Sequence, residues 1–143
     1  MKNTERMIHD FYLSIGVDKL DCFNMFYISE ALDLTLYFDN QHSKIYLNHT
    51  MKLLIIDNRL NQHTQQEDFF HLLAKYLIYD HHLVAEKVDD LTLHLAIPQH
   101  LLVGVELSSD TLSQHFNVTP NFASKRIKQM IMKGFDEDER FCL

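Results

Sequence analysis

Residues 65–80 read QQEDFFHLLAKYLIYD, and residues 84–98 read VAEKVDDLTLHLAIP. Large apolar side chains recur at helical spacing in both stretches. Glu67 follows Thr64 by three residues, the spacing of an N-terminal capping box, and Pro98 ends a helix. We therefore expect a helix that begins at Thr64 and a second helix over residues 83–96. The expected apolar faces are Phe69, Leu72, Leu73, Tyr76 and Leu77 in the first helix, and Val84, Val88, Leu91 and Leu95 in the second.

In the N-terminal third of the chain, the sequence pattern changes from helical to extended. Apolar residues recur at helical spacing from residue 3, Gly16 is a helix stop, and a second short helix is expected over residues 23–32. Three short runs of strand-forming residues follow, at 33–38, 43–47 and 53–57. Their short connections predict a small, mostly antiparallel sheet. The apolar run 51–56 fits either a buried strand or a pairing edge.

The C-terminal part predicts two short helices. Ser109 is the expected cap of the first, and Thr119 followed by Pro120 opens the second. The spacing of the apolar residues over 109–132 resembles a helix-turn-helix core. Residues 134–143 are acidic and are expected to form a loosely ordered tail. The chain is thus predicted to be of the α+β class, with N-terminal helices, a small sheet and a central helix pair in one domain over residues 1–133.

Composition excludes several classes of protein. The chain has 143 residues, of which 46% are hydrophobic, so it is neither disordered nor of low complexity. A net charge of −7 argues against a general nucleic-acid coat protein. Three glycines leave no phosphate-binding loop. No apolar run approaches ~20 residues and the N-terminus lacks a signal-peptide core, so we expect a cytoplasmic protein with no membrane partner. Cys22 and Cys142 are expected to be reduced thiols.

The order of the strand, the two central helices and the small-apolar-apolar-Pro ending resembles the ImmA/IrrE family of zinc-peptidase-like proteins. That resemblance implies a zincin-like helix carrying His-Glu-x-x-His and a third metal ligand on the next helix. Here the motif positions hold His71, Leu72 and Lys75, and the third ligand position holds Lys87. Leucine accepts no proton and lysine is cationic near neutral pH, so we expect no zinc, no other cofactor and no catalytic residue.

Three interpretations of the histidines and acids stay open. Glu67, His71 and Lys75 fit a solvated, salt-bridging helix face, and His71 also fits the wall of a vestigial cleft with Leu72, Lys75 and Lys87. An active metallopeptidase would instead need non-standard ligands, in which His71 combines with histidines or acids further along the chain. Those candidates are His81, His82, Glu86 and His94. Glu86, Asp90 and His94 are best interpreted as another solvated face.

The last expected helix carries a polar group of side chains that fits a contact surface for nucleic acid or a partner protein. These residues are Asn121, Lys125, Arg126 and Lys128. The acidic chain and the acidic segment just downstream disfavour DNA. Our leading hypothesis is therefore a non-catalytic pseudo-peptidase of a prophage or mobile element, which binds a partner protein such as a repressor through a basic and apolar cleft. The alternatives are an active metallopeptidase with non-standard ligands and a DNA-binding regulator that uses the C-terminal helices.

Overall fold

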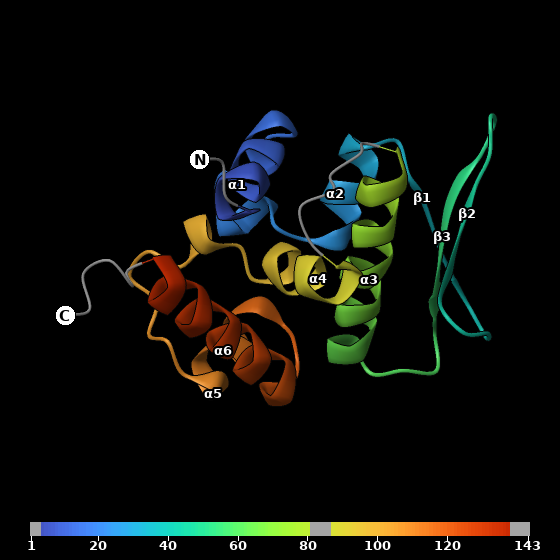
Figure 1. The fold of residues 1–143 in the computed structure, drawn as a ribbon. Helices are drawn as coiled ribbons and strands as arrows, with labels where there is room; N and C mark the ends of the chain where they lie inside the picture. Colours follow the sequence, from blue (N-terminus) through green and yellow to red (C-terminus); the bar gives the residue numbers. More distant parts are fainter. Residues whose placement is uncertain (1–3, 81–86, 138–143) are drawn as a thin grey trace.

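The computed structural model describes residues 4–80 and 87–137, and it confirms the α+β class (Figure 1). Helices precede and follow a small three-stranded sheet, which lies at one side of the molecule. In chain order, the elements are α1 (Thr4–Ser14), η1 (Leu20–Cys22), α2 (Met25–Ala31), β1 (Thr35–Asp39), β2 (Lys44–Leu47), β3 (Lys52–Asp57), α3 (Gln62–Asp80), α4 (Val88–Ala96), η2 (Gln99–Leu101), α5 (Ser109–Phe116) and α6 (Pro120–Glu137).

The N-terminal helices follow the sequence pattern. α1 buries Ile8 and Tyr12, and it ends before Gly16, whose φ of +82° is left-handed, as expected for a helix stop. α2 begins after Asn24, whose side-chain oxygen accepts a hydrogen bond from the Tyr27 N–H at 2.8 Å. The predicted second helix is therefore confirmed, with slightly shorter bounds.

The sheet is mixed, and the expectation of a mostly antiparallel sheet was wrong. The strand order is β1-β3-β2, with β1 parallel and β2 antiparallel to β3. β2 and β3 form a hairpin whose turn is held by the Asn48 side chain, which accepts from the Met51 N–H at 2.7 Å. β3 carries the continuous apolar run and takes the central position, because a strand with neighbours on both sides can bury such a run. The run 51–56 is thus mostly a buried strand rather than an edge.

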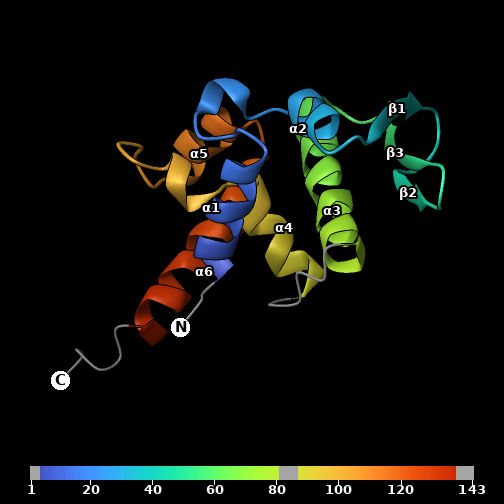
Figure 2. The same cartoon turned by 90° about the horizontal axis from the view of Figure 1, so that it is seen from above.

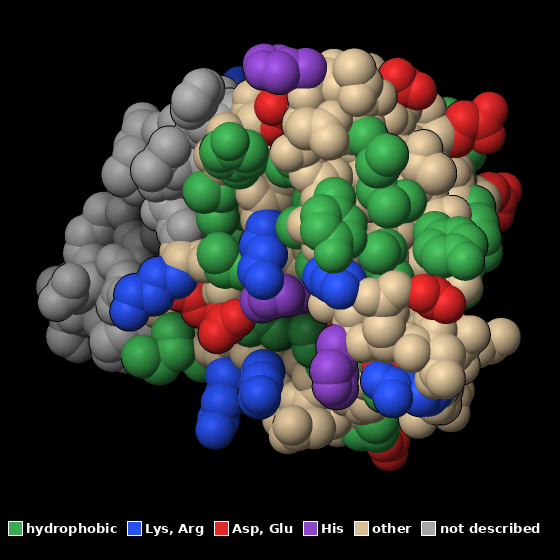
Figure 3. Space-filling model, turned by 90° about the vertical axis from the view of Figure 1, so that its right-hand side faces the viewer, with side chains coloured by type: hydrophobic (Ala, Val, Ile, Leu, Met, Phe, Trp, Pro, Cys, Tyr) green, Lys and Arg blue, Asp and Glu red, His purple; other side chains and the backbone are tan. Residues whose placement is uncertain are grey.

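One face of the sheet packs against helices and the other is open. α3 lies along the inner face, where Leu54 and Ile56 are fully buried (Figures 1 and 2). On the outer face, Tyr37 and Tyr46 are about half exposed, and apolar side chains gather there beside lysines and histidines (Figure 3). The sheet therefore covers α3 on one side, and α4 packs on α3 from another.

α3 begins earlier than predicted. The side chain of Asn61 accepts from the Thr64 N–H at 2.9 Å, so Asn61 caps the helix and Thr64 lies inside its first turn. The predicted apolar face is confirmed, since all its members are buried. α4 packs on α3 and also contacts α1 and α6 (Figure 2). It begins at Val88 rather than Leu83, and Val84 lies outside the described residues.

α5 and α6 form the predicted pair of helices joined by a short turn. Ser108, not Ser109, caps α5, because its Oγ accepts from the Thr111 N–H at 3.2 Å. Asn117 has a φ of +58° and ends α5, and the Thr119 hydroxyl accepts from the Phe122 N–H at 3.2 Å, as expected for the cap of α6. α6 continues to Glu137, which is within the segment expected to be a loose tail. Within residues 4–80 and 87–137, no helix has the length and apolar character to cross a membrane.

Candidate functional site

A cleft of about 310 Å³ lies between α3, α4 and α6. It corresponds to the surface between the two central helices that the sequence singles out, with α6 as a third wall. The lining residues are Glu67, Asp68, His71, Asp89, Thr92, Leu93, Phe122 and Lys125. We refer to this set as the α3–α4–α6 cleft. His71 and Lys125, which were predicted as parts of two separate sites, both line it.

The walls of the α3–α4–α6 cleft are fixed by contacts between elements. The Glu67 carboxylate on α3 accepts a hydrogen bond from the Thr119 N–H at 2.7 Å, which ties α3 to the start of α6. Across the cleft, the His71 Nδ1 lies 3.7 Å from an Asp89 carboxylate oxygen of α4. Because the Asp89 side chain is 93% exposed, this pair contributes little to stability.

The charge of the cleft differs from the expectation. Three carboxylates, those of Glu67, Asp68 and Asp89, stand against the single ammonium of Lys125 and the imidazole of His71. The sequence hypothesis of a basic and apolar cleft was therefore wrong. It assigned Lys75 and Leu72 to the cleft, whereas neither side chain lines it.

The positions of the peptidase-like motif do not come together. Leu72 is 2% exposed and packs in the core, so it belongs to the inner face of α3. Lys75 is exposed, and Lys87 is an exposed residue directly before α4. Neither lysine lines the cleft. Of the four predicted cleft residues, His71 alone lines the cleft. The Leu72 side chain is rotated by about 100° from that of His71 and points into the core, whereas Lys75 shares the helix face of His71 but lies one turn further along α3.

No group of three or more His, Cys, Asp or Glu side chains that could hold a metal ion occurs within residues 4–80 and 87–137. His81, His82 and Glu86, which the alternative metallopeptidase would recruit, lie outside the described residues. His94 is fully buried and does not line the cleft, so its assignment to a solvated face was wrong. Asp90 is exposed, as that assignment expected.

The buried side of α4 and α6 holds a charged network that the sequence analysis missed. Arg126 is fully buried, which contradicts its prediction as a contact for nucleic acid or a partner. Its guanidinium donates to the Ile97 carbonyl at 2.8 Å and to the Glu5 carboxylate at 2.8 and 3.0 Å. The His94 Nδ1 lies 3.0 Å from the same carboxylate. These contacts join α1, α4 and α6, so Arg126 is structural.

The pKa of the Glu5 carboxyl reflects this network. Burial alone would raise that pKa, but the hydrogen bond with His94 and the positive charge of Arg126 outweigh it, and the pKa falls from 4.5 to about 2. The remaining predicted contact residues of α6, Asn121, Lys125 and Lys128, are exposed. Lys125 lines the cleft. Of the predicted contact residues, only Asn121 and Lys128 are exposed on α6 outside the cleft.

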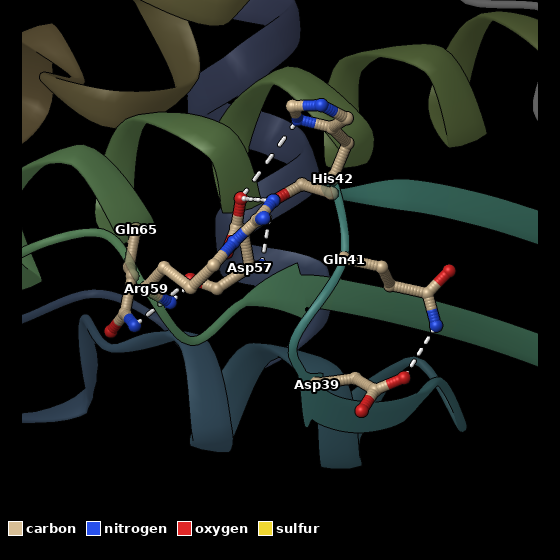
Figure 4. Close-up of polar contacts among 7 residues, drawn as sticks. Asp39, Gln41, His42, Asp57, Arg59 and Gln65 are labelled. Carbon is tan, nitrogen blue, oxygen red and sulfur yellow. Dashed lines mark hydrogen bonds and ion pairs between the residues drawn. The ribbon is translucent and has the colours of Figure 1, made fainter.

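A second polar cluster was also missed, at the end of β3 (Figure 4). The Asp57 side chain is only 5% exposed and accepts two hydrogen bonds of 2.9 Å from the Arg59 guanidinium. These bonds lower the pKa of the Asp57 carboxyl to about 2. The Gln65 side chain donates to the Asp57 carbonyl at 3.1 Å, which anchors α3 to the sheet. An acid at the end of an apolar strand was the signal for this cluster.

Comparison with known proteins gives one similarity. The chain is 22% identical over 143 residues to the phage-like element PBSX protein XkdA of Bacillus subtilis (strain 168), and the match covers 89% of this chain and 72% of that protein. No family model and no solved structure matches the chain. The ImmA/IrrE resemblance therefore remains a prediction. What the comparisons establish is a similarity, at low identity, to a protein of a phage-like element.

Proposed function

We propose that this protein is a non-catalytic, partner-binding module of a prophage or related mobile element. Its α3–α4–α6 cleft binds a partner protein such as a repressor and does not cut it. In the family that the chain resembles, the equivalent helix pair carries a metal-dependent peptidase site. The similarity to a protein of a phage-like element supports the mobile-element origin.

The lining of the cleft carries this proposal. His71 stands there without Leu72 or Lys75, and its ion-pair partner is the single exposed carboxylate of Asp89. Metal-assisted hydrolysis needs about three protein ligands and a general base beside the bound water. A pair made of one imidazole and one solvated carboxylate falls short of that set, whereas a cleft with charged walls over Leu93 and Phe122 suits recognition.

The charge of the cleft favours a basic partner segment. Its three carboxylates exceed its one ammonium group, and the whole chain carries a net charge of −7. DNA-binding proteins carry clustered lysines and arginines, so a repressor presents the complementary charge. Phe122 lines the same cleft, and its ring can stabilise a lysine or arginine bound there.

The two alternative functions draw less support from the geometry. His94, one of the candidate ligands of a metallopeptidase, is buried in the network of Glu5 and Arg126 and does not line the cleft. Arg126 is buried in the same network, so it is not exposed on α6 for contact with DNA. Lys125 lines an acidic cleft that would repel phosphates.

A binding experiment with matched charge variants tests the proposal. The probe is a fluorescently labelled, capped hexapeptide rich in lysine and arginine, with its glutamate-rich counterpart as the negative control. The cleft variant is D68N combined with D89N. The control variant is D33N combined with D110N, which makes the same change in net charge at exposed positions outside the cleft. Anisotropy at low salt gives the dissociation constants, and mass spectrometry reports whether the peptide stays intact.

We expect the basic peptide to bind and to remain intact, and the cleft variant to bind it at least about fivefold more weakly than the control variant. Equal weakening in both variants would mean that net charge, rather than the cleft, attracts the peptide. Absence of binding, or cleavage of the peptide by the wild-type protein, would contradict the proposal directly.

A further inference from the structure

A second cavity, of about 410 Å³, shares no lining residue with the α3–α4–α6 cleft. It is bounded by η1, the start of α2, β1, the start of α3 and the end of α5. We refer to it as the neutral groove. Its lining residues are Leu20, Phe23, Asn24, Met25, Phe26, Phe38, Gln62, Gln65, Gln66, His115, Phe116 and Asn117.

The floor of the neutral groove is part of the rigid core. The ring of Phe23 stacks on that of Phe70 with centroids 5.3 Å apart, and it meets the edge of Phe116 at 5.9 Å. Phe23 and Phe116 are 7% and 1% exposed, so their rings are held by packing on all other sides. The groove is therefore preformed, and an occupant would not have to order its floor.

The rim carries apolar side chains that nothing covers among the described residues. Phe26 is 62% exposed, and its ring lies at 6.1 Å from that of Phe38. Leu20, on the neighbouring wall, is 38% exposed. An exposed aromatic side chain beside a cavity is typical of contact surfaces, where a few residues, many of them aromatic, supply most of the binding energy.

The polar side chains of the neutral groove are amides and one imidazole. Asp, Glu, Lys and Arg are absent from its lining. Gln65 donates its amide nitrogen to the Asp57 carbonyl at 3.1 Å (Figure 4), and Gln66 donates to the Phe116 carbonyl at 3.4 Å. Each donation leaves the amide oxygen to accept a further hydrogen bond. Asn24 uses its oxygen for the Tyr27 N–H and keeps its amide nitrogen as a donor.

We propose that the neutral groove binds an uncharged peptide segment of a partner protein that presents an aromatic side chain. The ring would pack among the four phenylalanines, while the amide donor and acceptors pair with the peptide groups on either side of it. A charged side chain would lose its hydration without gaining a counter-charge, so the lining selects against it. The net charge of −7 likewise disfavours a phosphate-bearing ligand. This inference is independent of the function proposed for the α3–α4–α6 cleft.

The test uses capped pentapeptides that differ in one residue. The series Ac-Gly-Ser-X-Ser-Gly-NH2 carries Phe, Tyr, Trp, Ala, Lys or Glu at X, and each peptide is titrated into the ¹⁵N-labelled full chain while backbone amide shifts are recorded. F26A removes the rim aromatic. Y79A is the matched control, because Tyr79 is a 70% exposed aromatic residue outside the groove.

We expect at least one aromatic peptide to shift the amide signals of residues 24–26, 62–66 and 115–117. The Ala, Lys and Glu peptides should bind at least about tenfold more weakly, F26A should lose about tenfold in affinity, and Y79A should bind as the wild type does. The proposal is overturned if the aromatic peptides cause no shifts, if the shifts map elsewhere, or if the Lys or Glu peptide binds equally well. Equal affinity of F26A and Y79A would overturn it as well.

Discussion

Replacing Glu5 by glutamine removes the negative charge from the buried network of α1, α4 and α6. In the wild type, the Glu5 carboxylate lies 2.8 Å from the Arg126 guanidinium and 3.0 Å from the His94 imidazole. The glutamine amide has nearly the same shape, so the variant isolates the charge. Without that charge, the fully buried Arg126 loses its counter-ion.

The magnitude follows from the pKa of Glu5. Its fall from 4.5 to about 2 corresponds, at about 1.4 kcal/mol per unit, to about 3 kcal/mol of stabilisation. The Glu5 side chain is 16% exposed, so solvent screens part of this interaction. We therefore expect E5Q to lower the free energy of unfolding by about 2 kcal/mol at pH 7.

The pH dependence has a defined sign. A carboxyl whose pKa is lowered by folding stabilises the protein above its unfolded pKa, and this contribution is lost as the pH falls towards the folded pKa. The stability difference between wild type and E5Q should thus be constant above about pH 5 and fall by more than half by pH 3. Urea unfolding followed by circular dichroism, at pH 7, 5, 4 and 3, measures this difference.

The control is E106Q, which neutralises an exposed glutamate of the loop before α5. It should match the wild type within about 0.5 kcal/mol at pH 7. A difference for E5Q that is below this value, or that does not decrease between pH 5 and pH 3, would refute the ion-pair account of the network.

Three further predictions concern the core and the sheet. L72E places a carboxylate in the core and should lower the free energy of unfolding by about 3 kcal/mol or more in urea titrations. K75E, at an exposed position, should leave it nearly unchanged. An L72E variant as stable as the wild type would show that the side chain at 72 reaches solvent. Y12F removes a buried hydroxyl that donates to the Leu95 carbonyl at 2.6 Å, so it should lower the free energy of unfolding by about 1–2 kcal/mol. The control is Y79F, at an exposed tyrosine. Equal stability of the two variants would contradict the hydrogen bond of Tyr12. D57A removes the carboxylate that accepts hydrogen bonds from the Arg59 side chain and the Arg59 N–H. It should therefore lower the melting temperature and shift the amide resonance of Arg59. An unchanged melting temperature would mean that the hydrogen bonds between Asp57 and Arg59 do not stabilise the end of β3.

Local patterns in the sequence were sufficient for most elements but not for their long-range pairing. Helical spacing predicted the buried face of α3, and Thr119-Pro120 predicted the start of α6, because both signals act within a few residues. The strand order was not predictable in the same way. The short connections between the strands predicted a mostly antiparallel sheet. In the structure β3 lies between β1 and β2 and pairs in parallel with β1, because its apolar run is best buried at the centre.

The errors in the candidate site share one cause. Arg126 was placed on a contact surface and His94 on a solvated face, because charged and polar residues at regular helical spacing usually face water. Arg126 is three residues from Ala123 and next to Ile127, so it lies on the apolar stripe of α6. Its partner, Glu5, is 121 positions away in the sequence. A charge on an apolar stripe signals a buried partner, but the identity of that partner emerges only from the fold.

Metal content tests the central claim, that the α3–α4–α6 cleft is a recognition surface rather than a peptidase site. The chain is purified without chelator or histidine tag, and zinc, manganese and iron are quantified by elemental mass spectrometry before and after incubation with zinc and desalting. We expect far less than one metal ion per chain in both samples, because His71 has too few ligating neighbours among the described residues. About one zinc per chain, lost in H71A, would contradict the account and restore the peptidase hypothesis.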